Sequence, residues 1–210
     1  TIELTSDGSS VSGSDASKII SAINDGIPFE TELFIEKWSG DTYQGYITYD
    51  YYDSGYVKLD EWEDVKPDKF LKEKKESVKA QNKQIIANGS QNIITDVEWI
   101  TEPSLDRNQN TVYYAINYIF AEGGPAINAT TLILGRNGYT DATLVMSAED
   151  FLVSGTQNLT YIRNSYKYLP QKEYSKFTTG DKVAAVGIGG LLATSLGIKA
   201  FKAGGLVALL

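Results

Sequence analysis

The hydrophobic and polar positions in the first part of the chain predict one short helix followed by two strands. Over residues 14–24, Ile19, Ile20 and Ile23 fall on one face of a helix that Ser14 can cap. Residues 31–38 and 42–52 alternate roughly between apolar and polar side chains on either side of a Ser-Gly-Asp turn, as strands do. The Gly/Ser-rich stretch 6–14 that precedes them is typical of a loop.

A long helix is predicted over residues 67–87. Pro67 suits the first turn of a helix, and Gly89 suits the position just beyond its end. The apolar residues of this helix form a narrow stripe, and the remainder is mostly Lys and Glu. We therefore expect it to lie on a sheet whose other face is solvated.

Four further strands are predicted over residues 93–101, 111–121, 126–134 and 139–147. The Asn137-Gly138 pair between the last two is a strong hairpin signal, because both positions tolerate positive φ. Consecutive hairpin-linked strands form an antiparallel meander, and a helix near residues 156–167 would pack Leu159, Ile162 and Tyr166 onto it. The expected fold class is α+β, an antiparallel meander sheet packed by helices.

The tail from Val183 to Leu210 predicts a C-terminal hydrophobic membrane helix or helical hairpin. Residues 183–198 carry no charge, and Lys199 and Lys202 can extend toward lipid headgroups. The uncharged run alone would rise ~24 Å as a helix, short of the ~30 Å hydrocarbon core, whereas the whole tail is long enough. The alternative is a helix buried in the core, which the cost of glycine in a helix disfavours.

Small residues recur at every fourth position of this tail. They are Ala185, Gly189, Ala193 and Gly197, followed after a one-residue slip by Ala200, Gly204 and Ala208. This spacing lets two helix backbones approach closely in lipid. We therefore expect contact with membrane lipid and a homo-oligomer that forms through the tail.

The predicted tail also sets the domain organisation. Residues 1–180 are expected to form a soluble extracytoplasmic α+β domain, and residues 181–210 a membrane segment. The first residues lack the basic and apolar regions of a signal peptide, and a Ser/Gly/Asp-rich stretch follows, as in an exported mature protein. The expected location is membrane-anchored, with the domain in the periplasm or outside the cell.

Composition and charge exclude several classes of function. The net charge of -8 argues against nucleic acid as a partner, because phosphate binding needs a concentrated positive surface. The absence of Cys and His excludes thiol nucleophiles, Cys/His zinc sites and Ser-His-Asp triads. With no catalytic constellation in the sequence, we expect a protein that is not an enzyme and that has no catalytic residues, no metal and no cofactor.

The tyrosine-rich strand and the acidic turn after it form the candidate ligand site. Tyr49, Asp50, Tyr51 and Asp53 are its residues, and the carboxylates could offer oxygen ligands to calcium. The spacing lacks the Asp-x-Asp-x-Asp-Gly loop of a specific calcium site, and the alternative is an ordinary turn before a helix N-terminus. Tyr49 and Tyr51 share one face of the strand and Tyr52 lies on the other, so no single aromatic platform is predicted.

Three segments together resemble an uncharacterised family of bacterial membrane-anchored proteins. They are Gly55-Tyr56-Val57, Leu132-Ile-Leu-Gly135-Arg136-Asn-Gly138 and Thr179-Gly-Asp181-Lys182-Val183-Ala-Ala-Val-Gly187. The likeness covers roughly residue 43 to the end and implies an extracytoplasmic domain with a C-terminal membrane segment, without catalytic residues to carry over. The meander followed by Tyr161-Ile-Arg-Asn-Ser-Tyr also resembles a photosystem-subunit-like antiparallel α+β fold, which implies no function.

The leading hypothesis is a membrane-anchored cell-envelope protein of structural, self-assembling character. The alternative is an extracytoplasmic module that binds a ligand or an envelope component through Tyr49, Tyr51 and Asp53. A deep pocket at these residues would favour that alternative, and a flat solvated strand would remove it. A hydrolase that uses Asp or Glu is the third hypothesis, which requires two carboxylates to converge in a cleft with raised pKa values.

Overall fold

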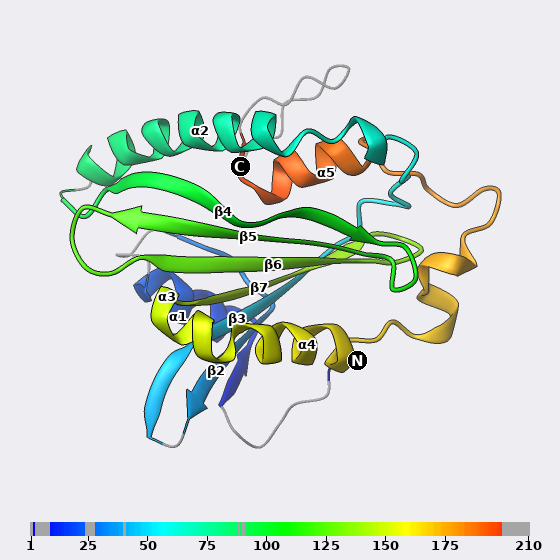
Figure 1. Cartoon of the computed structure of the whole chain (residues 1–210). Helices are drawn as coiled ribbons and strands as arrows, with labels where there is room; N and C mark the ends of the chain where they lie inside the picture. The colour runs from blue at the N-terminus through cyan, green and yellow to red at the C-terminus, as the bar shows by residue number, and fades with distance from the viewer. Residues whose placement is uncertain are drawn as a thin grey trace.

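The computed structural model describes residues 2, 9–23, 28–39, 41–87, 89 and 91–198. This part of the chain folds around one antiparallel sheet of seven strands in the order β1-β2-β3-β7-β6-β5-β4, with helices on both faces (Figure 1). The strands are β1 (Ser10–Ser12), β2 (Leu33–Ser39), β3 (Thr42–Tyr52), β4 (Ile94–Asp106), β5 (Thr111–Phe120), β6 (Ala126–Leu134) and β7 (Tyr139–Ser147).

The predicted meander is confirmed in β4 to β7, which pair in sequence order. The structure extends it, because β3 pairs antiparallel with β7 and so joins the first hairpin to the same sheet. Part of the predicted N-terminal loop is also a strand. Residues 10–12 pair with β2, from Ser10 opposite Ile35 to Ser12 opposite Leu33, and form the edge of the sheet.

The helices divide between the two faces of the sheet. In Figure 1, α2 and α5 cover one face and α4 covers the other. The helical elements are α1 (Ser14–Ile23), η1 (Trp62–Asp64), α2 (Pro67–Ala87), α3 (Ala148–Asp150), η2 (Phe151–Gly155), α4 (Thr156–Ser165), η3 (Pro170–Lys172), η4 (Tyr174–Lys176) and α5 (Ile188–Ser195). Helix α1 packs Ala16 and Ile20 against Phe34 of β2.

Each face of the sheet has its own apolar core, so the expectation of a solvated face is wrong. Under α2 and α5, the core contains Phe70, Val112, Leu132, Leu191 and Leu192. Under α4, it contains Ile47, Ala129, Leu144, Leu159 and Ile162, and Tyr166 packs against it at partial burial. The predicted contacts of Leu159, Ile162 and Tyr166 with the sheet are therefore confirmed.

The described part of the tail is not the predicted membrane helix but a short helix in the core of the domain. Val183 pairs with Tyr56 through an isolated parallel bridge. Helix α5 then inserts Ile188, Leu191 and Leu192, which are at most 2% exposed. No helix within the described residues is long and apolar enough to cross a bilayer. The buried-helix alternative describes residues 188–195, and residues 199–210 lie outside the described part of the chain.

A glycine ends this helix and explains why it is too short to span a bilayer. Gly197 has φ +63, which favours glycine, and its amide donates to Thr194 while the amide of Ile198 donates to Ala193. This pair of bonds is a Schellman motif, which stops a helix and satisfies its last carbonyls. An uncharged run shows only that its side chains avoid water, and eight helical residues of ~12 Å suffice to bury them here.

The stripe of small residues does not form one helical face over the described positions. Ala185 precedes α5 and is exposed, Gly189 is half-buried, Ala193 is buried and Gly197 follows the helix. The predicted continuation through Ala200, Gly204 and Ala208 lies outside the described residues.

A polar network holds the end of α5 against β7. Ser195 Oγ donates to Asp141 Oδ2 at 2.8 Å, and Thr143 Oγ1 donates to Asp141 Oδ1 at 2.8 Å. The Tyr114 hydroxyl lies 2.6 Å from Ser195 Oγ and donates to it, because the Ser195 hydrogen is directed at Asp141. Burial raises the pKa of Asp141 to about 6, since a carboxylate loses hydration there without gaining a cation.

We expect Leu192→Ala to lower the free energy of unfolding by about 2–5 kcal/mol, because Leu192 is 0% exposed and the change leaves a cavity. Leu152→Ala is the control, since Leu152 is 87% exposed. Urea unfolding followed by circular dichroism measures both. Equal, small effects of the two variants would contradict the buried position of α5.

The raised pKa of Asp141 predicts that the stability of the fold depends on pH. The folded state binds the Asp141 proton more tightly than the unfolded chain does, so this group stabilises the fold at about pH 4 and loses that effect as the pH rises through about 6. Asp141→Asn should remove a pH-dependent difference on the order of 3 kcal/mol. Urea unfolding of both proteins between about pH 4 and 7 measures it, and a difference that does not change with pH would contradict the assignment.

Candidate functional site

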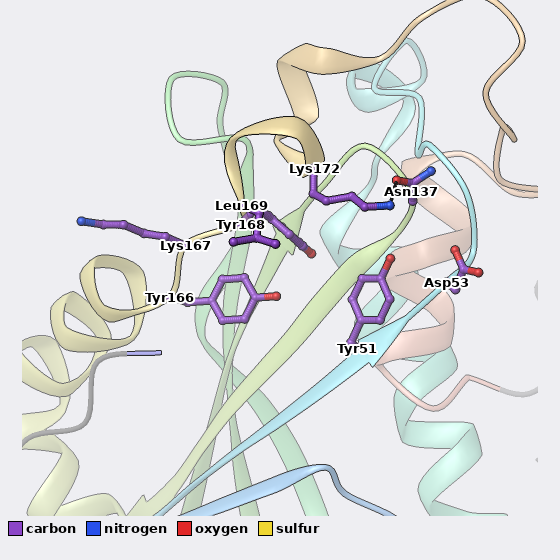
Figure 2. Close-up of a pocket in the computed structure, with 8 residues that line it drawn as sticks. All are labelled: Tyr51, Asp53, Asn137, Tyr166, Lys167, Tyr168, Leu169 and Lys172. Atoms are coloured by element: carbon purple, nitrogen blue, oxygen red, sulfur yellow. Dashed lines mark hydrogen bonds between the residues drawn. The ribbon is translucent and has the colours of Figure 1, made fainter. Parts of the chain in front are cut away.

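An open cleft of about 510 Å³ lies where the end of β3, the β6–β7 turn and the segment after α4 meet (Figure 2). Three separate parts of the chain line it. They contribute Tyr51 and Asp53, then Asn137, and then Tyr166, Lys167, Tyr168, Leu169 and Lys172. A volume of this size falls in the range of small-molecule sites, which is ~300–1,000 Å³.

The alternation of β3 places its tyrosines at different depths. Tyr49 is 2% exposed below the cleft, where its ring lies 6.2 Å from that of Tyr166 and its hydroxyl lies 3.5 Å from Ser165 Oγ. Tyr51, two residues on, shares this face and is 38% exposed at the cleft. Its ring meets Tyr168 edge-on at 6.5 Å. Burial raises the pKa of Tyr51, and nearby Asp53 adds to the shift, so the phenol stays protonated at neutral pH.

Hydrogen bonds to the sheet fix the two tyrosines that follow α4. Tyr168 donates its hydroxyl to the Ile133 carbonyl at 3.0 Å, and Thr140 Oγ1 donates to the Tyr166 hydroxyl at 2.7 Å. Burial strongly raises the pKa of Tyr168, so it remains a donor. The Tyr168 ring also needs Gly135 beneath it, because a Cβ on that residue would lie 2.7 Å from the ring.

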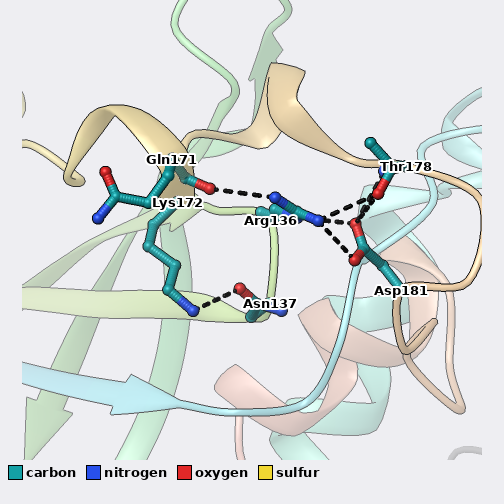
Figure 3. A network of polar contacts seen from close by, with 6 residues as sticks. All are labelled: Arg136, Asn137, Gln171, Lys172, Thr178 and Asp181. Atoms are coloured by element: carbon teal, nitrogen blue, oxygen red, sulfur yellow. Dashed lines mark hydrogen bonds and ion pairs between the residues drawn. The ribbon is translucent and has the colours of Figure 1, made fainter.

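An arginine clamp holds the segment beyond the cleft in place (Figure 3). Arg136 donates to both carboxylate oxygens of Asp181, each at 2.8 Å, and to Thr178 Oγ1 at 3.0 Å. These bonds lower the pKa of Asp181 to about 2. Arg136 Nη1 also donates to the Gln171 carbonyl at 3.5 Å. Nearby, Lys172 Nζ donates to the Asn137 side-chain oxygen at 2.9 Å, which ties the same segment to the β6–β7 turn.

The structure brings together two of the four predicted ligand residues. Tyr51 and Asp53 line the cleft, Tyr49 lies buried beneath it, and Asp50 faces the opposite side of the sheet, where it accepts from the Glu32 amide at 2.9 Å. Within the described part of the chain, no three His, Cys, Asp or Glu side chains gather closely enough to hold a metal ion.

Among the described residues, two carboxylates have raised pKa values, and they do not line the cleft. Asp50 and Asp141 are cross-strand neighbours on β3 and β7, and burial raises the pKa of each. Their oxygens accept hydrogen bonds from Glu32, Ser195 and Thr143, and neither lines the cleft. The raised pKa values of this pair therefore follow from burial in the sheet, and the hydrolase hypothesis stays a prediction.

Sequence reasoning missed most of the cleft. The residues it missed are Asn137, Tyr166, Lys167, Tyr168, Leu169 and Lys172. The Tyr-x-Tyr spacing after α4 matches the Tyr-x-Tyr spacing of β3 and was the available signal, but nothing local shows that the two lie opposite each other.

Comparisons with known proteins give a family without an assigned activity. The family described as "Protein of unknown function (DUF2167)" matches residues 1–210. The match includes the first 42 residues, which the sequence resemblance did not cover. It confirms an uncharacterised family, whereas bacterial origin and membrane anchoring stay predictions. No curated protein matches.

Among solved structures, the chain is similar to cyanobacterial PsbP (CyanoP) from Synechocystis sp. PCC 6803, described as a solution structure. The identity is 10%, the TM-score is 0.47, and the alignment covers 80% of this chain and 85% of that one. A likeness at this level carries no information about function.

We expect Arg136→Gln to loosen the segment beyond the cleft while the sheet stays intact. The variant loses the bidentate pair with Asp181, so amide hydrogen exchange at Thr178 and Asp181 should quicken roughly tenfold or more. Arg107→Gln is the matched control, because the Arg107 pair with Glu63 is long, at 3.9 Å, and exposed. Equal exchange in both variants would show that the clamp does not hold this segment.

Proposed function

The chain belongs to the DUF2167 family, whose description assigns no function, and we propose that it is a non-enzymatic module that binds a small polar ligand in the cleft at Tyr51. The observation that carries the proposal is the convergence of Tyr51 and Asp53 with three polar or aromatic side chains from elsewhere in the chain, Asn137, Tyr166 and Lys172. Clefts with an apolar body and a few placed polar groups are the usual form of ligand sites.

The lining fits binding better than catalysis. Tyr51 and Leu169 are exposed to about 38% and 51%, so they offer apolar surface at the mouth. Asp53 is the one carboxylate among the lining residues, and general acid–base catalysis by carboxylates normally uses a second group with a shifted pKa. The same residues can anchor a ligand without further chemistry.

The site is also built to keep its shape without a ligand. The Tyr168 hydroxyl is bonded to the sheet, and the Arg136 clamp fixes the segment that carries Lys172. A lining that is ordered before binding loses less conformational entropy when the ligand binds. This favours affinity even in an open cleft.

We propose further that the domain acts outside the cytoplasm at a membrane, as expected for a module that binds an envelope component. The apolar residues 203–210 and the two lysines before them support this location at the level of sequence. Self-association through the small-residue stripe has less support, because its described members do not share a helical face.

The proposal is tested by following backbone amides in NMR during titration with a library of small polar ring compounds, including monosaccharides, nucleosides and aromatic acids. We expect shifts at residues 51–53, 137 and 166–172. Tyr51→Ala should weaken binding of each hit roughly tenfold or more, because it removes an aromatic wall.

Tyr43→Ala is the matched control for this experiment. Tyr43 is a similarly exposed tyrosine of β3, at 43%, but it packs edge-on against Trp38 at the other end of the strand. A library that shifts only amides away from the cleft, or hits weakened equally by both variants, would refute the assignment of the site.

A further inference from the structure

The hydrogen-bonding groups at the cleft are mostly donors, and this indicates the charge of the ligand. The inference rests on the proposed function and concerns the same site. Lys172 and Asn137 present hydrogens at the rim of the cleft, and Asp53 is the one carboxylate among the lining residues.

The ammonium group of Lys172 has hydrogen-bond donors that are available to a ligand. Its ammonium group contacts the neutral side-chain oxygen of Asn137 at 2.9 Å, and within the described residues it forms no ion pair with a carboxylate. An ammonium carries three donors, so two remain for a ligand. The residue is exposed, and its side chain extends toward Asn137 at the rim of the cleft (Figure 2).

Asn137 is oriented by this contact. Because its side-chain oxygen accepts from Lys172, its amide nitrogen is left to donate elsewhere, and no described residue accepts from that nitrogen. The backbone carbonyl of Asn137 is occupied by the Gly55 amide at 2.8 Å, which holds the turn against the end of β3.

Tyr166 adds no free donor. Its hydroxyl accepts from Thr140 at 2.7 Å and is hydrogen-bonded to the Tyr168 side chain, so it is held against the protein. Lys167 also lines the cleft, but its side chain extends away from Tyr51 (Figure 2).

Lys172 is therefore the lysine directed at the cleft, beside one lining carboxylate, in a chain whose net charge is -8. Asp53 is an acceptor, and it would bind donors such as ligand hydroxyl groups. The exposed faces of Tyr51 and Leu169 would cover the apolar C–H surface of a ring.

We propose that the cleft binds a saccharide that carries an acidic group, a carboxylate or a phosphate, with the acidic group on Lys172 and Asn137. The ring hydroxyls then face Asp53 and the ring itself lies on Tyr51. Carboxylate and phosphate share this chemistry, since both are anions that accept several charge-assisted hydrogen bonds.

Four monosaccharides that differ in one substituent test the proposal: D-glucuronate, D-glucose 6-phosphate, D-glucose and D-glucosamine. Each is titrated into the whole protein, and the dissociation constant is taken from the amide shifts of residues 51–53, 137 and 166–172. We expect at least one acidic sugar to bind roughly tenfold more tightly than glucose, and glucosamine to bind most weakly. The better of the two acidic sugars identifies carboxylate or phosphate as the preferred group.

Lys172→Gln should reduce the affinity for the better acidic sugar roughly tenfold and leave glucose unchanged. Lys176→Gln is the matched control, because Lys176 is an exposed lysine four residues on that does not line the cleft. Both variants change the net charge equally, so a general electrostatic effect would appear in both.

Four results would overturn the inference. Equal binding of glucose and both acidic sugars, or tightest binding of glucosamine, would show that the donors do not select an anion. Binding of library aromatics at the cleft without any monosaccharide would reject the saccharide and leave the proposed function standing. Only a cleft that no compound perturbs would remove both.

Discussion

The sheet of this protein is apolar on both faces, and the need to cover both faces determines the rest of the structure. Helix α4 covers one face and α5 covers the other, yet they are consecutive α-helices along the chain. The chain between them, residues 166–187, must therefore pass around the end of the sheet, as the right-hand side of Figure 1 shows. The cleft forms where this crossing begins, because Tyr166 to Lys172 pass over the end of β3 and the β6–β7 turn.

A crossing segment with little regular structure needs specific contacts, because few backbone bonds hold it. Tyr56 stacks with Tyr174 at 4.4 Å and with Phe177 at 4.1 Å, and the Tyr174 hydroxyl donates to the Val57 carbonyl at 2.7 Å. Isolated bridges join Gly135 to Glu173 and Tyr56 to Val183. The Arg136–Asp181 pair lies among these contacts. It therefore helps to hold the crossing segment on its path around the end of the sheet.

Much of the fold could be predicted from the sequence because its signals are local. Strands β3, β6 and β7 and helix α2 begin and end at the predicted residues, since Pro67 and the Asn137-Gly138 turn act within a few residues of themselves. The tail could not be predicted in the same way. An apolar run does not show whether lipid or protein will cover it, and α5 is covered by α2 and the sheet only because the crossing brings it there. Gly197 is a local stop signal, but a glycine that ends a helix and one in a membrane helix interface look alike in sequence.

The cleft shows why a small part of a site can be predicted and most of it cannot. Tyr51 and Asp53 were recognisable because they follow each other on one strand, whereas Asn137 and Lys172 become neighbours only through the crossing. Their contact also decides the chemistry of the site. Lys172 uses the oxygen of Asn137 and so directs the amide nitrogen of that side chain outward, which turns a group able to donate or accept into a donor. The same crossing that covers the second face of the sheet thus brings together the two donors on which the proposed anion binding depends.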